Sequence, residues 1–107
     1  MILTRSEEML LLAVHRLQHN AYGVNIRNLM KEFTGKEMAF GALFVQLDRL
    51  AKKELLSSYL TEPTPERGGR SKRIYLLTGD GKNALIRTKK VQETIWQNID
   101  GLGLDKT

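Results

Sequence analysis

The sequence predicts a small, mainly α-helical fold that carries one β-hairpin. Three observations indicate this class. Apolar residues recur at helical spacing in three successive segments of the first half of the chain. Two short strand-like runs follow, separated by a turn that contains two prolines and two glycines. A longer helical pattern comes next, and the 107 residues are enough for one domain.

The first three helices are expected over residues 5–18, 24–33 and 40–53. Thr4 and Glu7 have the spacing of a capping box at the start of the first helix. Gly35 follows the second helix, at a position where a left-handed residue commonly ends a helix. One side of the third helix is an apolar line that we expect to face the core, made of Leu43, Leu47 and Leu50.

The two strands are expected over residues 55–61 and 72–77, with a long turn between them. Three helices followed by a hairpin is the element order of a winged helix-turn-helix. In that fold the third helix enters a DNA major groove and the hairpin forms the wing. The element order therefore predicts a DNA-binding domain.

The last helix is expected to begin after Thr78 and to reach Ile99. Its apolar face is wider than one contact surface needs, and leaving it exposed would favour aggregation. We therefore expect a homodimer in which this helix pairs with its symmetry mate. The chain would then divide into a winged helix-turn-helix domain over residues 1–80 and a dimerisation helix with its tail over residues 81–107. The residues expected at the dimer interface are Ala84, Leu85, Val91, Ile95, Trp96 and Ile99.

The charge of the chain also favours a polyanionic partner. Seventeen Lys and Arg against twelve Asp and Glu give a net charge of +5. The densest acid-free cluster lies in the turn between the strands, where Gly68 and Gly69 would let the backbone approach a phosphate closely. Its four cations, expected to contact DNA, are Arg67, Arg70, Lys72 and Arg73. The alternative is a solvated hairpin tip whose charges prevent edge-to-edge strand pairing.

The outer face of the third helix is the second candidate DNA contact. Arg49 and Lys53 suit phosphates, and Gln46, on the flank, could read an adenine edge. Ala42 and Val45 can offer apolar contact, for example to a thymine methyl group. The alternative for Lys52 and Lys53, at the end of this helix, is that they belong to a solvated face.

Other chemistry is not indicated by the residues present. The chain has no cysteine, and His15 and His19, four residues apart, have no evident third metal ligand. We expect no metal, no cofactor and no catalytic activity. The longest apolar run has six residues, far short of the roughly 20 that a membrane span requires. The expectation is a cytoplasmic protein without a membrane partner.

Three segments resemble the PadR-like family of bacterial winged-helix transcriptional regulators. The residues Tyr22 to Ile26 resemble the Tyr/Gly motif that opens the family's second helix. The residues Gly41 to Leu50 resemble the recognition-helix motif, usually Gly-Thr-Leu-Tyr followed by Leu-x-Arg-Leu. The residues Gly68 to Gly81 resemble the wing and the Tyr-x-Leu-Thr-x-x-Gly signature into which it runs. Ala42, Phe44 and Val45 depart from the usual Thr, Tyr and basic residue.

This resemblance implies a homodimeric repressor that binds a palindromic operator. In one branch of the family a tryptophan of the C-terminal helix lines a pore at the dimer interface, which would make Trp96 a ligand-binding residue and add a small-molecule effector as a partner. The alternative for Trp96 is a dimer-core aromatic. Two other functions remain open at this point, a winged-helix module for protein–protein contact and a ligand-binding dimer without specific DNA recognition.

Overall fold

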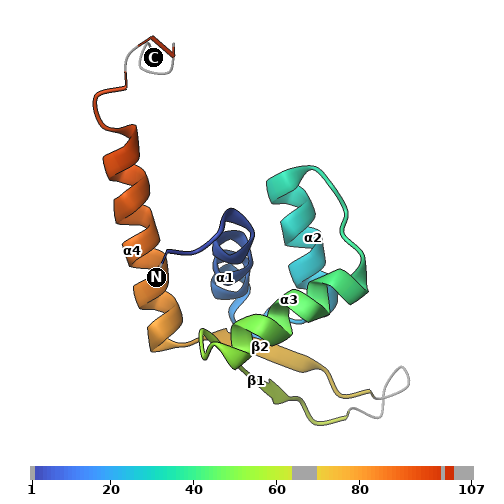
Figure 1. Ribbon diagram of the computed structural model, residues 1–107. Coiled ribbons are helices and arrows are strands. Elements are labelled where there is room, and N and C mark those ends of the chain that lie inside the picture. The colour runs from blue at the N-terminus through green and yellow to red at the C-terminus, as the bar shows by residue number, and fades with distance from the viewer. Residues whose placement is uncertain (1, 64–69, 100, 103–107) are drawn as a thin grey trace.

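The computed structural model describes residues 2–63, 70–99 and 101–102. Three α-helices lie on one side of a two-stranded hairpin, and a fourth α-helix follows the hairpin (Figure 1). In chain order the elements are α1 (Arg5–Leu17), η1 (Gln18–Asn20), α2 (Gly23–Thr34), α3 (Phe40–Lys52), β1 (Leu56–Leu60), β2 (Arg73–Leu77) and α4 (Gly79–Trp96). The predicted class, mainly helical with a hairpin wing, is confirmed.

The predicted helix signals act as expected in α1 and α2. The Thr4 hydroxyl oxygen accepts a bond from Glu7 N at 3.1 Å, and Thr4 N donates to Glu7 Oε1 at 2.9 Å, which completes the capping box. Gly35 adopts φ 76° and ends α2. The first helix ends one residue earlier than predicted, because Gln18 has φ 52° and leads into the short helix η1.

The core lies between α1, α2 and α3. The three leucines predicted to face it are fully buried, at 0, 0 and 1% exposure for Leu43, Leu47 and Leu50. Leu10 and Leu11 of α1 and Ile26 of α2 pack in the same cluster. Burial of these apolar side chains is the main favourable contribution to the folding of the helical unit.

The hairpin is antiparallel and pairs Leu56 with Leu77 and Leu60 with Arg73. Each strand is shorter than predicted, since Leu55 and Lys72 lie outside the ladder. Tyr75 N donates to Ala21 O at 2.9 Å, so β2 is also held by the segment between η1 and α2. This bond fixes the wing against the start of α2.

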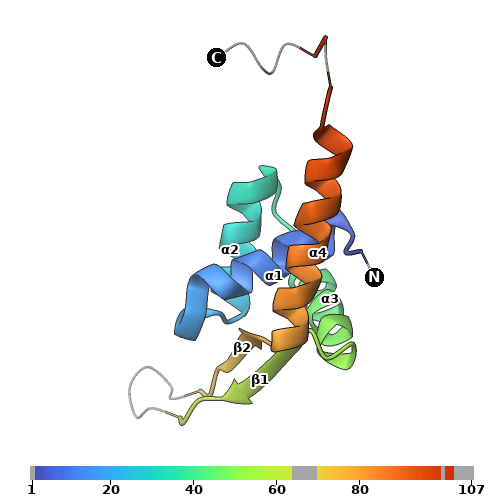
Figure 2. The same ribbon diagram turned by 90° about the vertical axis from the view of Figure 1, so that its left-hand side faces the viewer.

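The last helix differs from the prediction in its end and in its buried face. It stops at Trp96, because Gln97 is extended, so Ile99 lies beyond it and not on its stripe. Ala84 is 1% exposed and packs in the core of its own chain, contrary to the expectation that it faces a partner. Thr88 is equally buried and accepts a bond from Leu3 N at 3.0 Å. Farther along α4, Gln92 Nε2 donates to Glu8 Oε1 of α1 at 3.0 Å, and the end of α4 stands clear of α1 (Figure 2).

None of the helices in the described part of the chain is long and apolar enough to cross a membrane.

Candidate nucleic-acid interface

The outer face of α3 is open to solvent where the sequence predicts it. Ala42, Val45 and Arg49 are exposed, and Val45 is exposed by 52%. The burial of the three leucines on the opposite side fixes this orientation. This face therefore offers the Arg49 cation and a small apolar surface to a partner.

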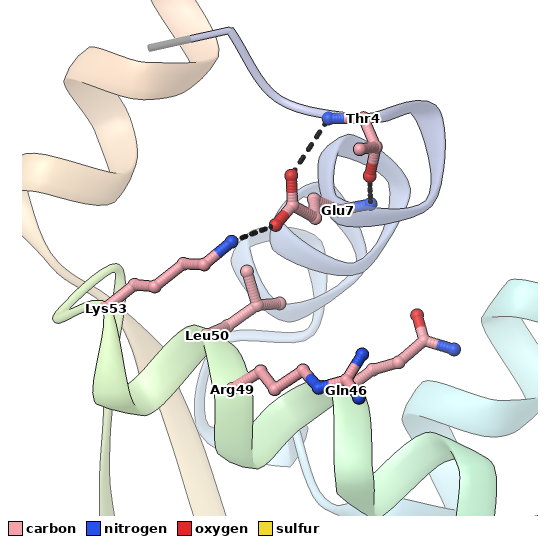
Figure 3. Close-up of a pocket in the computed structure, with 6 residues that line it drawn as sticks. All are labelled: Thr4, Glu7, Gln46, Arg49, Leu50 and Lys53. Atoms are coloured by element: carbon pink, nitrogen blue, oxygen red, sulfur yellow. Dashed lines mark hydrogen bonds and ion pairs between the residues drawn. The ribbon is translucent and has the colours of Figure 1, made fainter.

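Gln46 and Lys53 do not face solvent freely, because their polar atoms form hydrogen bonds with the first turn of α1. Ser6 Oγ donates to Gln46 Oε1 at 2.7 Å, and Gln46 is half-buried. Lys53 Nζ donates to Glu7 Oε2 at 2.7 Å (Figure 3). The hydrogen bond from Lys53, together with the bond from the Thr4 backbone, lowers the pKa of Glu7 below its ordinary value of 4.5. Lys53, predicted to contact DNA, thus carries a paired charge.

A small cavity of about 190 Å³ lies between α3 and the first turn of α1. Figure 3 shows Lys53 reaching up to Glu7, while Gln46 and Arg49 extend below the capping box. The residues that line the cavity are Thr4, Glu7, Gln46, Arg49, Leu50 and Lys53. Next to this cavity, hydrogen bonds from the first turn of α1 hold the side chains of Gln46 and Lys53.

The base of the wing carries three of the four predicted cations. Arg70, Lys72 and Arg73 are exposed, and Arg67 lies outside the described residues. Lys72 Nζ lies 4.2 Å from the centroid of the Tyr22 ring, and Arg73 Nη1 donates to Ser58 Oγ at 3.0 Å. These contacts hold two cations in place at the base of the hairpin.

An open groove of about 490 Å³ joins the wing to the helices. Its lining residues come from the start of α2, from α3 and from the wing, and are Tyr22, Gly23, Val24, Phe44, Arg70, Ser71, Lys72 and Arg73. A Cβ atom at Gly23 would lie 2.8 Å from Phe44 Cζ, so the glycine leaves room for the ring. The groove thus brings the wing cations together with Phe44 of the third helix, whereas the predicted contact residues Ala42, Val45 and Arg49 do not line it.

Helical periodicity and charge do not predict that Tyr22 and Phe44 line this groove, or that Ser6 contacts Gln46. For Tyr22 and Phe44 a signal existed, since both lie in the segments that resemble the family motifs. No sequence signal indicated Ser6, because its partner Gln46 is 40 residues away in the chain.

Exposed apolar side chains also lie on α1 and on more than one side of α4. Ile86, Val91, Ile95 and Trp96 of α4 are exposed by 54, 37, 63 and 52%, and Leu12 of α1 by 39%. Leu85, half-buried, lines a shallow cavity of about 160 Å³ together with Glu8, Leu12, Ile86 and Lys89. Five of the six predicted dimer residues therefore lie outside the core, although Ile99 is not on the helix.

Within residues 2–63, 70–99 and 101–102, no three His, Asp or Glu side chains gather as a metal site would require.

Comparisons with known proteins agree with this architecture. The model of the transcriptional regulator PadR-like family matches residues 11–87. A PadR-like transcription factor from Bacteroides fragilis is 26% identical and superposes with a TM-score of 0.64, over 84% of this chain and 85% of that one. A PadR family transcription regulator from Clostridium difficile R20291 is 23% identical with a TM-score of 0.63, over 83% and 88% of the two chains.

RosR from H. salinarum is 24% identical with a TM-score of 0.67, over 91% of this chain and 80% of that one. At such identities the likeness to RosR and to the C. difficile protein shows a shared fold. No curated protein matches the chain significantly.

Proposed function

Because the chain belongs to the PadR-like family of transcriptional regulators, we propose that it is a repressor that binds a palindromic operator as a homodimer. Regulators of this family are DNA-binding proteins and not enzymes. The finer parts of the proposal, namely the DNA-contact residues, the dimer and the operator symmetry, are supported by the two surfaces described above.

The groove between α2, α3 and the wing carries the proposal. The exposed cations Arg70, Lys72 and Arg73 line it together with Phe44 of α3. In this proposal the wing cations and Arg67 bind phosphates, Arg49 binds a phosphate or a base edge, and Ala42 and Val45 contact bases through apolar atoms. Lys53 donates one of its three N–H groups to Glu7 and would bind a phosphate with the others.

The apolar surface of α4 supports the dimer. Ile95 and Trp96, in the last turn of the helix, are exposed by 63 and 52% in the single chain. A second copy of the same surface would bury them around a two-fold axis. Residues 1–80 would then bind DNA, and the exposed part of residues 81–107 would join the two copies. Such a pair could present two α3 helices to successive major grooves, about 34 Å apart.

Selection of bound duplexes from a random-sequence DNA pool tests this function. The proposal expects enrichment of a palindrome whose half-sites are centred about one helical turn apart. An affinity that falls steeply with salt would accompany it, because bound phosphates release counterions. A pool that stays random, with duplex binding absent or insensitive to salt, would instead indicate a protein-interaction module.

A further inference from the structure

The hydrogen bond between Ser6 and Gln46 bears on which base the third helix can read. Gln46 is half-buried at the edge of the outer face of α3, next to the exposed residues Ala42 and Arg49. Its side-chain oxygen accepts from Ser6 Oγ at 2.7 Å, across 40 residues of sequence. The oxygen is therefore directed at α1 and away from a partner on the open face.

The two N–H groups of the Gln46 side chain make no hydrogen bond to the residues that the structure describes. Among the residues that the structure describes, Ser6 is the hydrogen-bond partner of this side chain, and it bonds to the oxygen. A glutamine that recognises adenine uses both ends of its amide, the oxygen toward N6 and the nitrogen toward N7. Because the bond to Ser6 directs the oxygen at α1, Gln46 presents its N–H groups to a partner on the open face.

We propose that Ser6 is a positioning residue that makes Gln46 a donor-only reader, so that Gln46 selects guanine against adenine at one position of each half-site. Guanine presents two neighbouring acceptors, N7 and O6, in the major groove, whereas adenine presents an acceptor beside the N6 donor. Two N–H groups can donate to both acceptors of guanine, whereas at adenine one of them would face the N6 donor. This inference rests on the proposed function, since it assumes that α3 lies in a major groove.

The first turn of α1 makes this arrangement rigid. Glu7, next to Ser6, completes the capping box and also bonds to Lys53 at the end of α3. Hydrogen bonds thus join the two helices at two residues of α3 and the segment that follows it, Gln46 and Lys53. These two contacts keep the Ser6 hydroxyl in position before DNA binds. An amide that is to select one base must be held in this way.

Selection from a random duplex pool with four chains tests the inference. These are the wild type, Gln46→Ala, Ser6→Ala, and Ser57→Ala as a matched control, because Ser57 is an exposed serine of β1. The position at which Gln46→Ala loses its preference identifies the base that Gln46 contacts. The wild type and Ser57→Ala should favour guanine over adenine there by at least about fivefold, the low end for a good base contact. Ser6→Ala frees the amide to turn, so adenine should rise to within about twofold of guanine.

A second variant keeps the inference testable if Ser6→Ala folds poorly. Gln46→Glu retains an oxygen that can accept from Ser6 but replaces the donating amide nitrogen with an acceptor. The same position should then change to cytosine, whose N4 group donates.

The inference is overturned if the wild type prefers adenine at this position, if Gln46→Ala changes no base preference, or if Ser6→Ala leaves the pattern unchanged. These results would leave the palindrome, and hence the proposed function, intact. A wild-type chain that enriches no sequence would overturn the proposed function and this inference together.

Discussion

At the scale of single residues, Arg70 and Arg87 carry the same charge in different places. Arg70 lines the groove at the wing, whereas Arg87 is an exposed residue of α4 that does not. Replacing Arg70 with Ala removes one phosphate contact, so the slope of log affinity against log salt should fall by about one unit. Arg87→Ala is the matched control and should leave the slope unchanged. Equal slopes for the two variants, measured by fluorescence anisotropy across a salt series, would contradict the assignment of the wing.

The ion pair between Glu7 and Lys53 makes a pH-dependent contribution to stability. The hydrogen bond from Lys53 lowers the pKa of Glu7, so the folded state favours its charged form. The stabilisation is therefore complete above the ordinary pKa of 4.5 and is lost as the pH falls through the lower pKa of the folded state. Glu7→Gln, which can keep the capping bond to Thr4 N, should be less stable than the wild type at about pH 6.

Urea unfolding at two pH values checks this expectation. The difference in the free energy of unfolding between the wild type and Glu7→Gln should shrink at about pH 3, where the carboxyl is increasingly protonated. A difference of the same size at both pH values would assign the effect to the cap instead of the charge.

The residues of the interface were predictable from the sequence to different degrees. The exposure of Ala42, Val45 and Arg49 follows from helical periodicity alone, because the leucines opposite them must be buried. The environment of Gln46 and Lys53 does not follow, since their partners Ser6 and Glu7 lie 40 and 46 residues away. Periodicity identifies the face of a helix on which a residue lies, but not the side chain of another helix that meets it.

At the scale of elements, the junction between the hairpin and α4 depends on Gly81. A Cβ atom at this position would overlap the carbonyl oxygen of Leu55 and would come within 2.6 Å of Leu77 Cδ1. Nothing lies within 4 Å of a Cβ atom built at Gly79, two residues earlier in the same helix. The glycine of the sequence signature that follows the wing therefore has a steric reason, because α4 packs closely on Leu55, between α3 and β1, and on Leu77 of β2.

Gly81→Ala should accordingly destabilise the chain by about 1–3 kcal/mol, the usual cost of overpacking. Gly79→Ala, the matched control, should change stability by less than about 1 kcal/mol. Thermal unfolding of the two variants measures both values. A Gly81→Ala chain as stable as the control would mean that α4 does not pack on Leu55 as described.

The elements themselves were largely predictable, and the exception is the end of α4. The capping box, Gly35 and the strand-like runs determine the other boundaries to within one or two residues. The apolar spacing of Ile95 and Ile99 suggested one more helical turn, but the backbone leaves the helix after Trp96. Spacing shows which residues could share a face and does not show where the helix ends.

At the scale of the whole molecule, the shape is elongated. The radius of gyration is 16.5 Å, with extents of 58, 27 and 22 Å, against a radius of about 13 Å for a compact domain of this size. The end of α4 accounts for part of this length, since it projects past α1 (Figure 2). Its apolar side chains Ile95 and Trp96 are exposed. A helix that projects in this way is poorly covered by its own chain.

Charge at Ile95 should therefore prevent dimer formation. Ile95 is 63% exposed on α4, and Leu60 is 59% exposed at the end of β1. Sedimentation velocity at micromolar concentration should give a dimer mass for the wild type and for Leu60→Lys, and a monomer mass for Ile95→Lys. A buried lysine would lack a partner at the interface, whereas the Leu60 position stays in water. A dimer that survives Ile95→Lys would place the interface elsewhere.

The central claim is that two copies of this chain bind one palindromic DNA site specifically. Titration of the chain onto its selected palindrome, followed by sedimentation velocity, tests it most directly when a scrambled duplex of the same length is the reference. We expect two chains per palindrome, and an affinity for the palindrome at least about a thousandfold above that for the scrambled duplex. One chain per duplex, with an affinity that scrambling leaves unchanged, would contradict the account.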